Sequence, residues 1–168
     1  GGKIVDLGAG GRKITPECVT IDFTRIGDTN VVADIHNIPL KDETIDCLFC
    51  TGTLEHVHNP ETVLKEILRV LKKEGIIYID VPFMQCYHPD PVDYWRFTIK
   101  GIELICTRNG FTMIETGVNI GSASSLTWIL MAFSRTIFSN RIINKLFSTI
   151  FSMLVSPIKY LDKYTIKG

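Results

Sequence analysis

The chain has 168 residues, enough for one domain with a substantial core. Its 18 Lys and Arg balance 18 Asp and Glu, so the net charge gives no indication of a nucleic-acid partner. The charges are unevenly spread, because residues 1–134 carry 12 basic against 17 acidic side chains and residues 135–168 carry 6 against 1. We therefore expect an acidic body followed by a basic C-terminal region.

The five cysteines are odd in number and irregularly spaced, which is typical of reduced thiols in a cytosolic protein. Cys47 and Cys50 have the spacing of a metal or redox pair, but they lie in an apolar run typical of a buried strand. Side chains three apart on a strand point to opposite faces, so we interpret both as core residues. No secretory signal is recognisable, and a cytoplasmic location is expected.

Four β-rich runs are predicted as strands, at residues 4–7, 19–23, 31–34 and 45–50. The first runs into glycines, the second and third reach acidic residues, and the fourth is nearly continuous in apolar residues. Only ten residues, 9–18, lie between the first glycine of the turn and the second strand, fewer than a full crossover helix needs. The first crossover helix is therefore predicted to be reduced.

A helix is predicted from the cap at Asn59 to Gly75, with Lys72 and Lys73 in its last turn. A strand at 75–83, a helix at 98–110 and a sixth strand at 111–118 follow. Strands alternating with helices predict an α/β fold with a parallel sheet and right-handed crossovers.

After residue 120 the sequence becomes apolar and helical, at 125–138 and 141–164. We predict a core domain at 1–120 and a helical extension at 121–168. No run is long enough to span a bilayer, and two roles stay open for residues 122–168. The helices complete a core or a homodimer interface, or they lie on a membrane as a peripheral contact. In the second case the residues near lipid headgroups are Trp128, Arg135, Arg141, Lys145, Lys159 and Lys163.

The glycine-rich turn after the first strand, "VDLGAGGR", admits three kinds of ligand. A Walker phosphate loop is excluded, because no Gly-Lys-Ser/Thr follows at the required spacing. A dinucleotide is disfavoured, because Lys13 stands where a third small residue is needed and the helix N-terminus for the pyrophosphate is missing. A ligand without phosphates fits better, since Asp22 can bind a ribose diol and Asp34 an exocyclic amine.

With these residues, "VDLGAGG", "TIDF" and the block from "ADIHNIPL" to "IIYIDVP" resemble class I S-adenosylmethionine-dependent methyltransferases. The pattern is most similar to the ubiquinone- and menaquinone-type small-molecule enzymes, and it covers residues 4–118. The resemblance implies a Rossmann-like, mostly parallel sheet with flanking helices and S-adenosyl-L-methionine as cofactor. The segment "HPDPVDYWRFTIKGIELICTRNGF" further resembles superfamily members found among bacterial envelope-glycan genes.

Carried over to this chain, the resemblance assigns each cofactor contact to a residue. It implies that Asp6 helps to fix the glycine turn and that Thr51 lies beneath the cofactor. The methionine part is lined by Gly8, Ala9 and Gly10. Asp22 binds the ribose with Phe23 against the adenine, and the base is read by Asp34 and Ile35. The chain departs from the family in its reduced first crossover, in the missing helices before the first strand, and in apolar helices where a seventh strand is usual.

Catalytic candidates lie in the loops after the fourth and fifth strands, where they can reach a transferred methyl group: His56, His88, Asp93 and Tyr94. Metal-ligating side chains occur there too, but no ligand spacing marks a site, and we expect no metal. The acceptor is predicted to be a small molecule or a glycan- or lipid-linked group, methylated at oxygen or nitrogen. No nucleic-acid partner is expected. Two alternatives stay open: a non-catalytic methyltransferase-like scaffold or membrane-docking module, and an NAD-dependent oxidoreductase.

Overall fold

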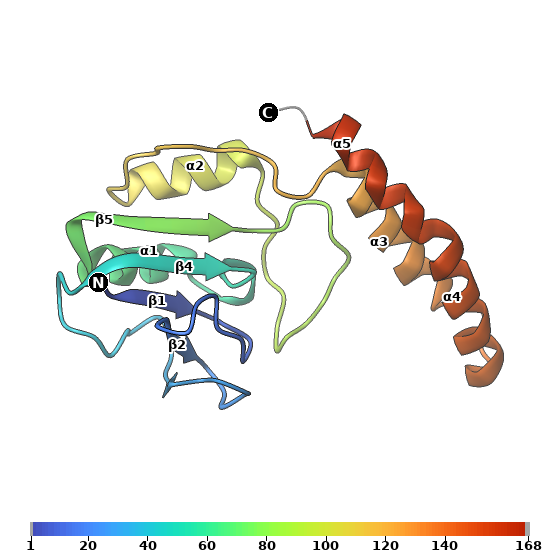
Figure 1. Cartoon of the computed structure of the whole chain (residues 1–168), viewed down its shortest axis with the longest axis horizontal. Helices are drawn as coiled ribbons and strands as arrows, with labels where there is room; N and C mark the ends of the chain where they lie inside the picture. Colours follow the sequence, from blue (N-terminus) through green and yellow to red (C-terminus); the bar gives the residue numbers. More distant parts are fainter. Residues whose placement is uncertain (1, 167–168) are drawn as a thin grey trace. The chain divides into compact units, whose positions relative to one another are not determined.

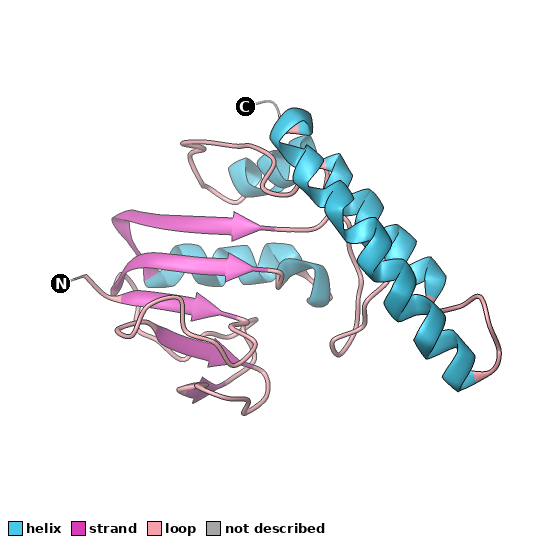
Figure 2. Cartoon of the chain, turned by 45° about the vertical axis from the view of Figure 1, so that its right-hand side comes forward, coloured by secondary structure: helices cyan, strands magenta, loops and turns pink. Residues whose placement is uncertain are grey.

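The computed structural model describes residues 2–166, apart from the side chain of Thr165. Within these residues the chain forms two compact units (Figures 1 and 2). The first unit comprises residues 2–83 and 89–115, and the second comprises residues 84–88 and 116–166. The outermost ends of the two predicted domains, residues 1, 167 and 168, lie outside the described residues.

The first unit is built on a five-stranded parallel sheet (Figure 1). Its strand order is β3-β2-β1-β4-β5. The chain therefore moves outward from β1 to β3 and then crosses back to place β4 on the other side of β1, so the strand order reverses between β1 and β4. The strands are β1 (Ile4–Leu7), β2 (Val19–Asp22), β3 (Val31–Val32), β4 (Ile45–Thr51) and β5 (Leu71–Asp80). This confirms the predicted Rossmann-like α/β architecture.

Two capped helices and a short 3-10 helix complete the first unit: η1 (Leu54–His56), α1 (Pro60–Val70) and α2 (Ile99–Arg108). The Asn59 side chain accepts a hydrogen bond from the Thr62 N–H at 3.2 Å, which satisfies a free donor at the start of α1. The Thr98 hydroxyl does the same for Gly101 in α2 at 3.0 Å. Both predicted helix starts are confirmed.

The core of the first unit lies between the sheet and α1. Leu7, Leu48 and Cys50 from the sheet are fully buried together with Leu64 and Ile67 from α1. Cys50 is a core residue as predicted, and burial raises the pKa of its thiol. The described residues between β1 and β2 form turns and no helix, which confirms the prediction that the first crossover helix is reduced.

The predicted end of α1 is wrong, because the helix stops at Val70 and β5 begins at Leu71. Leu71 fits the apolar period of the helix, but its backbone is extended and its side chain is buried at the start of a strand. Ile45 of β4 pairs with Leu71 of β5, and Cys47 pairs with Ile76. A step of two residues in β4 therefore lies opposite a step of five in β5. Residues 72–75 therefore form a bulge in β5 and not the last turn of a helix.

The predicted sixth strand is also wrong, since residues 111–118 form no strand. The β-rich pattern "FTMIETGV" makes no ladder with the sheet, whose last strand is β5, and Ile114 is 81% exposed. Three other predicted strands are shorter than expected at their carboxyl ends, because β2 ends at Asp22, β3 at Val32 and β5 at Asp80.

The second unit is helical, as the sequence predicted. It contains α3 (Ser122–Ser134), α4 (Arg141–Val155), the 3-10 helix η2 (Ser156–Leu161) and α5 (Asp162–Thr165). Helix α3 packs along both α4 and η2, which makes a helical hairpin (Figure 2). Among the described residues, no helix combines the length and apolarity needed to cross a bilayer.

Candidate functional site

The candidate site lies at the carboxyl ends of the parallel strands. Leu7 at the end of β1 is in register with Ile21 of β2 and with Cys50 of β4. The residues that follow these strands therefore emerge at one edge, beside the point where the strand order reverses. In open α/β sheets this edge is where ligands bind.

Gly8 is the point at which the glycine turn (Gly8–Gly11) touches the end of β4. Its φ is +70°, and a Cβ there would lie 2.3 Å from the hydroxyl oxygen of Thr53. That hydroxyl is 3.0 Å from the Leu7 carbonyl, to which it can donate. Only glycine fits this conformation and this approach, so the turn is held tightly against β4.

Gly10 joins the same turn to the acid at the end of β2. The Gly10 N–H donates to Oδ2 of Asp22 at 3.0 Å, and the Thr24 N–H donates to Oδ1 at 3.2 Å. A Cβ on Gly10 would meet nothing within 4 Å, so the space beside the turn is open. The predicted methionine-binding glycines and the predicted ribose-binding acid are therefore neighbours, and each carboxylate oxygen keeps a lone pair for a ligand hydroxyl.

Asp6 lies on β1 just below this turn and is 3% exposed. Within the described residues its Oδ1 has no hydrogen-bond partner. Burial raises the pKa of Asp6 to about 6; the Arg12 charge opposes this shift and the Asp22 charge adds to it. The described hydrogen bonds that hold the turn join it to other residues: the Gly8 N–H donates to the Ile21 carbonyl at 2.8 Å, the Gly10 N–H to Asp22 at 3.0 Å, and the Gly11 carbonyl accepts from the Asp28 N–H at 3.1 Å. The turn-fixing role expected of Asp6 remains a prediction.

The loop after β3 carries the two residues expected to read the base. Oδ1 of Asp34 accepts a hydrogen bond from the His36 N–H at 2.9 Å and lies 2.6 Å from Nδ1 of the same histidine. These contacts lower the pKa of Asp34, so it is ionised at neutral pH. Ile35 is buried, whereas Phe23 after β2 is 66% exposed. An exposed aromatic ring can stack on the face of an adenine, and a carboxylate can accept a hydrogen bond from its exocyclic amine.

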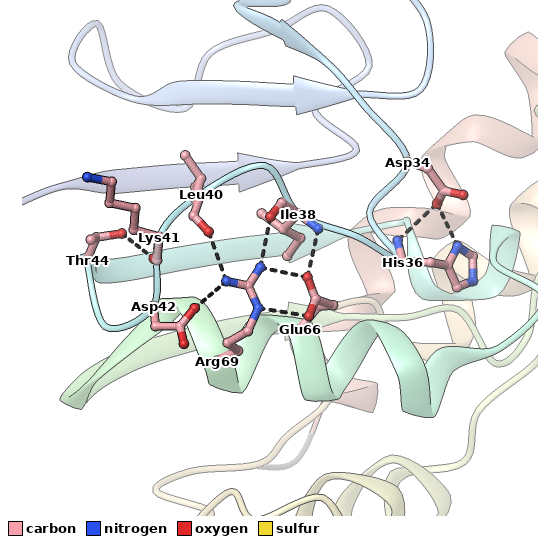
Figure 3. Close-up of polar contacts among 9 residues, drawn as sticks. All are labelled: Asp34, His36, Ile38, Leu40, Lys41, Asp42, Thr44, Glu66 and Arg69. Atoms are coloured by element: carbon pink, nitrogen blue, oxygen red, sulfur yellow. Dashed lines mark hydrogen bonds and ion pairs between the residues drawn. The ribbon is translucent and has the colours of Figure 1, made fainter.

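An ionic network anchors this loop to α1 (Figure 3). The Arg69 guanidinium donates to Glu66 at 2.8 and 2.7 Å and to the carbonyl oxygens of Ile38 and Leu40 at 2.8 and 2.9 Å. Glu66 in turn accepts from the Ile38 N–H at 2.9 Å. The Ile38 N–H and the carbonyls of Ile38 and Leu40 therefore all have charged partners on α1, which hold the segment that follows Asp34 in place.

A strap of four residues (92–95) lies over η1 in the first unit. The Tyr94 N–H donates to the Glu55 carbonyl at 2.8 Å, and the indole N–H of Trp95 donates to the Val57 carbonyl at 2.9 Å. Nδ1 of His56 lies 2.6 Å from the Val92 carbonyl. A carbonyl only accepts, so in the neutral ring Nδ1 carries the proton and Nε2 keeps its lone pair.

The strap brings three of the four predicted catalytic residues together, His56, Asp93 and Tyr94. The Asp93 carboxylate is engaged by Arg96 at 2.6 and 2.7 Å, so its charge is paired. Tyr94 is 52% exposed and its ring is open to an incoming molecule. His88 belongs to the second unit, where its Nδ1 lies 3.0 Å from the Cys86 carbonyl. Thr51, predicted to lie under the cofactor, is half-buried at the end of β4.

Sequence reasoning missed the residues that support the site. Thr53 is buried against Gly8, and the His36 ring stacks on His58 with 4.2 Å between ring centroids. Glu66 and Arg69 had only the spacing of an ordinary helical ion pair. The one usable signal was the position of Thr53, two residues after a strand that had to end beside the glycine turn.

Comparison with known proteins finds similarity to methyltransferases. Residues 6–79 match the family model described as "Methyltransferase domain". A sterol 4-C-methyltransferase of Caenorhabditis elegans is 26% identical over 137 residues, which are 74% of this chain and 40% of that protein. A tRNA U34 carboxymethyltransferase of Campylobacter lari is 27% identical over 95 residues, or 50% and 32% of the two chains. The chain thus spans less than half the length of these curated relatives.

Among solved structures, the [4+2]-cyclase SpnF superposes with a TM-score of 0.60 over 98% of this chain and 70% of that one, at 16% identity. This likeness concerns the fold alone. Residues 6–79 are thus similar to a methyltransferase domain, and the sheet has the fold that the resemblance to class I S-adenosylmethionine-dependent methyltransferases predicted. Membership of that superfamily and the use of its cofactor remain predictions. The narrower resemblance to ubiquinone- and menaquinone-type enzymes remains a prediction.

Proposed function

We propose that this chain binds S-adenosylmethionine at the carboxyl edge of its sheet and supports methyl transfer to a small-molecule or glycan- or lipid-linked acceptor at oxygen or nitrogen. The observation that carries the proposal is the hydrogen bond between Gly10 and Asp22. It joins a glycine turn with open space beside Gly10 to a carboxylate suited to a ribose diol. The pyrophosphate of a dinucleotide would find no helix N-terminus after the turn, because the described residues between β1 and β2 form no helix.

When bound against the glycine turn and Asp22, the cofactor would supply an activated methyl group on a sulfonium, with a neutral thioether as the leaving group. A hydroxyl or ammonium acceptor must also lose a proton. This chain's contribution is then to bind both partners, orient them and accept that proton.

We propose that His56 accepts the proton that the acceptor loses. Its Nδ1 is engaged by the Val92 carbonyl, so in the neutral ring the basic nitrogen is Nε2. Oε1 of Glu55 lies 3.8 Å from Nε2. Nitrogen NMR of the histidine side chains tests this tautomer. The proposal expects a protonated Nδ1 on neutral His56, and a protonated Nε2 instead contradicts it.

The acceptor class rests on the strap. Tyr94 and Trp95 are 52% and 41% exposed, and aromatic faces of this kind suit stacking against a sugar ring. Arg96 is engaged by Asp93, so the strap offers aromatic surface more than positive charge. Residues 1–134 are acidic, with 12 basic against 17 acidic side chains, which disfavours a phosphate backbone. One relative is named for a tRNA, and the expected absence of a nucleic-acid partner therefore stays a prediction.

Titration calorimetry with S-adenosylhomocysteine and with NAD tests the cofactor assignment. The full chain is expected to bind S-adenosylhomocysteine, and Asp22→Asn should weaken binding by about 10- to 100-fold because a charged acceptor is lost. Asp28→Asn makes the same charge change in the neighbouring loop and should leave binding unchanged. Binding of NAD instead would favour an oxidoreductase. Equal affinities for wild type and Asp22→Asn would contradict the proposed site.

A further inference from the structure

The helical hairpin of the second unit packs through small polar residues. The buried side chains of α3 are Ala123, Ser125, Thr127 and Ser134. The three hydroxyls are satisfied locally, because each donates to a carbonyl of its own helix region, at 3.1, 2.9 and 2.7 Å. Small residues allow close helix approach, but they bury little apolar surface. The hydrophobic surface of this unit therefore lies elsewhere.

The large apolar side chains of α4 face outward. Its packed side includes Phe147, which contacts Phe138 and Phe151 with centroids 5.1 and 5.6 Å apart, and the buried Val155. Six other apolar side chains of the helix are between 51% and 81% exposed: Ile142, Ile143, Leu146, Ile150, Met153 and Leu154. At 100° per residue they occupy one arc of about 120°, which we call the apolar stripe. A continuous stripe of this size marks an interaction surface.

The charges of the same unit are almost all positive. Residues 116–166 contain five basic side chains and one acid, Asp162, so their net charge is +4. The Asp162 carboxylate is taken up at the start of α3, where it accepts from the Ala123 N–H at 2.9 Å and from the Ser124 N–H at 3.2 Å. Within residues 2–166, no ion pair is formed by the five cations Arg135, Arg141, Lys145, Lys159 and Lys163. Their charge is available to a partner.

Basic and hydroxyl groups adjoin the apolar stripe. Arg141 and Lys145 lie on the side of α4 next to Ile142 and Leu146 along the helical wheel. An open groove of about 450 Å³ adjoins it through Met153 and is otherwise lined by Arg135, Ser148, Thr149, Ser152 and Ser156. The Ser148, Thr149 and Ser156 hydroxyls donate to carbonyls of their own helix region, so the group suited to a phosphate here is the Arg135 guanidinium.

We propose that the stripe and its basic rim bind the surface of an anionic phospholipid bilayer, with α4 lying in the plane of the interface. The apolar side chains enter the acyl boundary, and the cations and the groove meet lipid phosphates. A second copy of this chain is disfavoured, because it would bring another surface of net charge +4 against the first. The proposal does not rest on methyl transfer.

Vesicle flotation of the full chain tests this surface, with phosphatidylcholine alone or mixed with phosphatidylglycerol. We expect flotation with the anionic vesicles and little with the neutral ones. Ile142→Ser with Leu146→Ser should weaken binding at least about 10-fold, because it removes two apolar side chains that would move from water into the bilayer. Arg141→Gln with Lys145→Gln should remove most of the preference for anionic lipid.

The control is Ile76→Ser with Leu104→Ser, which makes the same chemical changes at two residues of the first unit that are 54% and 49% exposed, and it should leave flotation unchanged. Circular dichroism confirms that each variant keeps its helices. Flotation that is the same for wild type and the stripe variant overturns the proposal, as does equal binding to both vesicle types. Light scattering that shows a dimer abolished by the stripe substitutions, without vesicle binding, assigns the surface to a second copy.

Discussion

The two units bury opposite kinds of side chain. In the first, large aliphatic residues such as Leu7, Leu48 and Ile67 are fully buried between the sheet and α1. In the second, the buried positions of α3 are small or hydroxylated, while Leu146 and Leu154 are 63% and 72% exposed. The first unit therefore has its own core and can hold a precise ligand site. The second exposes the apolar surface that a partner would cover.

The largest expected effect is the difference in stability between the same substitution made in each of the two units. Leu64→Ala in α1 is expected to lower the free energy of unfolding by about 2–5 kcal/mol, because it leaves a cavity in a packed core. Leu154→Ala is the matched change in α4, and at this exposed position it should cost less than about 0.5 kcal/mol. Urea unfolding followed by circular dichroism measures both. Similar losses would contradict the contrast between the units.

A second comparison concerns two glycines within the site. Gly8→Ala should cost about 2–4 kcal/mol, because its positive φ is strained and the new Cβ overlaps Thr53. Gly10→Ala also has a positive φ but meets open space, so it should cost only about 1–2 kcal/mol. Thermal unfolding of the two variants measures the difference. A Gly10 variant less stable than the Gly8 variant would mean that Thr53 does not support the turn.

The buried acid of the first unit predicts a pH dependence. The pKa of Asp6 is raised from 3.8 to about 6, so the folded state binds its proton more tightly than the unfolded state. Its contribution to stability is therefore present below about pH 4 and is lost as the pH rises to about 6. Asp6→Asn should raise the free energy of unfolding at pH 7 by at most about 3 kcal/mol. Urea unfolding from pH 4 to pH 8 tests this, and a gain at pH 4 that persists unchanged at pH 8 would contradict it.

The smallest expected effect concerns the network on α1. Arg69→Gln should cost about 1–2 kcal/mol, because the Ile38 and Leu40 carbonyls lose their donor and Glu66 its partner. Arg108→Gln, at an exposed position in the last turn of α2, is the control and should stay within about 0.5 kcal/mol of wild type. Amide hydrogen exchange in residues 34–40 should also rise in the Arg69 variant alone. Unchanged protection there would mean that the network does not hold the loop that carries Asp34.

The sequence predicted the sheet because its strands are short apolar runs with a marked end. It predicted the neighbouring positions of Gly10 and Asp22 for the same reason, since parallel strands end at one edge. The end of α1 was missed because Leu71 fits the helical period although it is buried in a strand. Thr53 was missed because its contact with Gly8 joins positions far apart in the chain. In α4, periodicity identified the apolar residues, but only the packing separated the buried Val155 from the exposed Leu154.

The most direct test of the account is a crystal structure of the full chain grown with S-adenosylhomocysteine. We predict the methionine part against Gly8 and Gly10, the ribose hydroxyls on the Asp22 carboxylate, and the adenine between Phe23 and the loop that carries Asp34. Ligand density anywhere else on the molecule, or contact with the turn but not with Asp22, would contradict the proposed cofactor site.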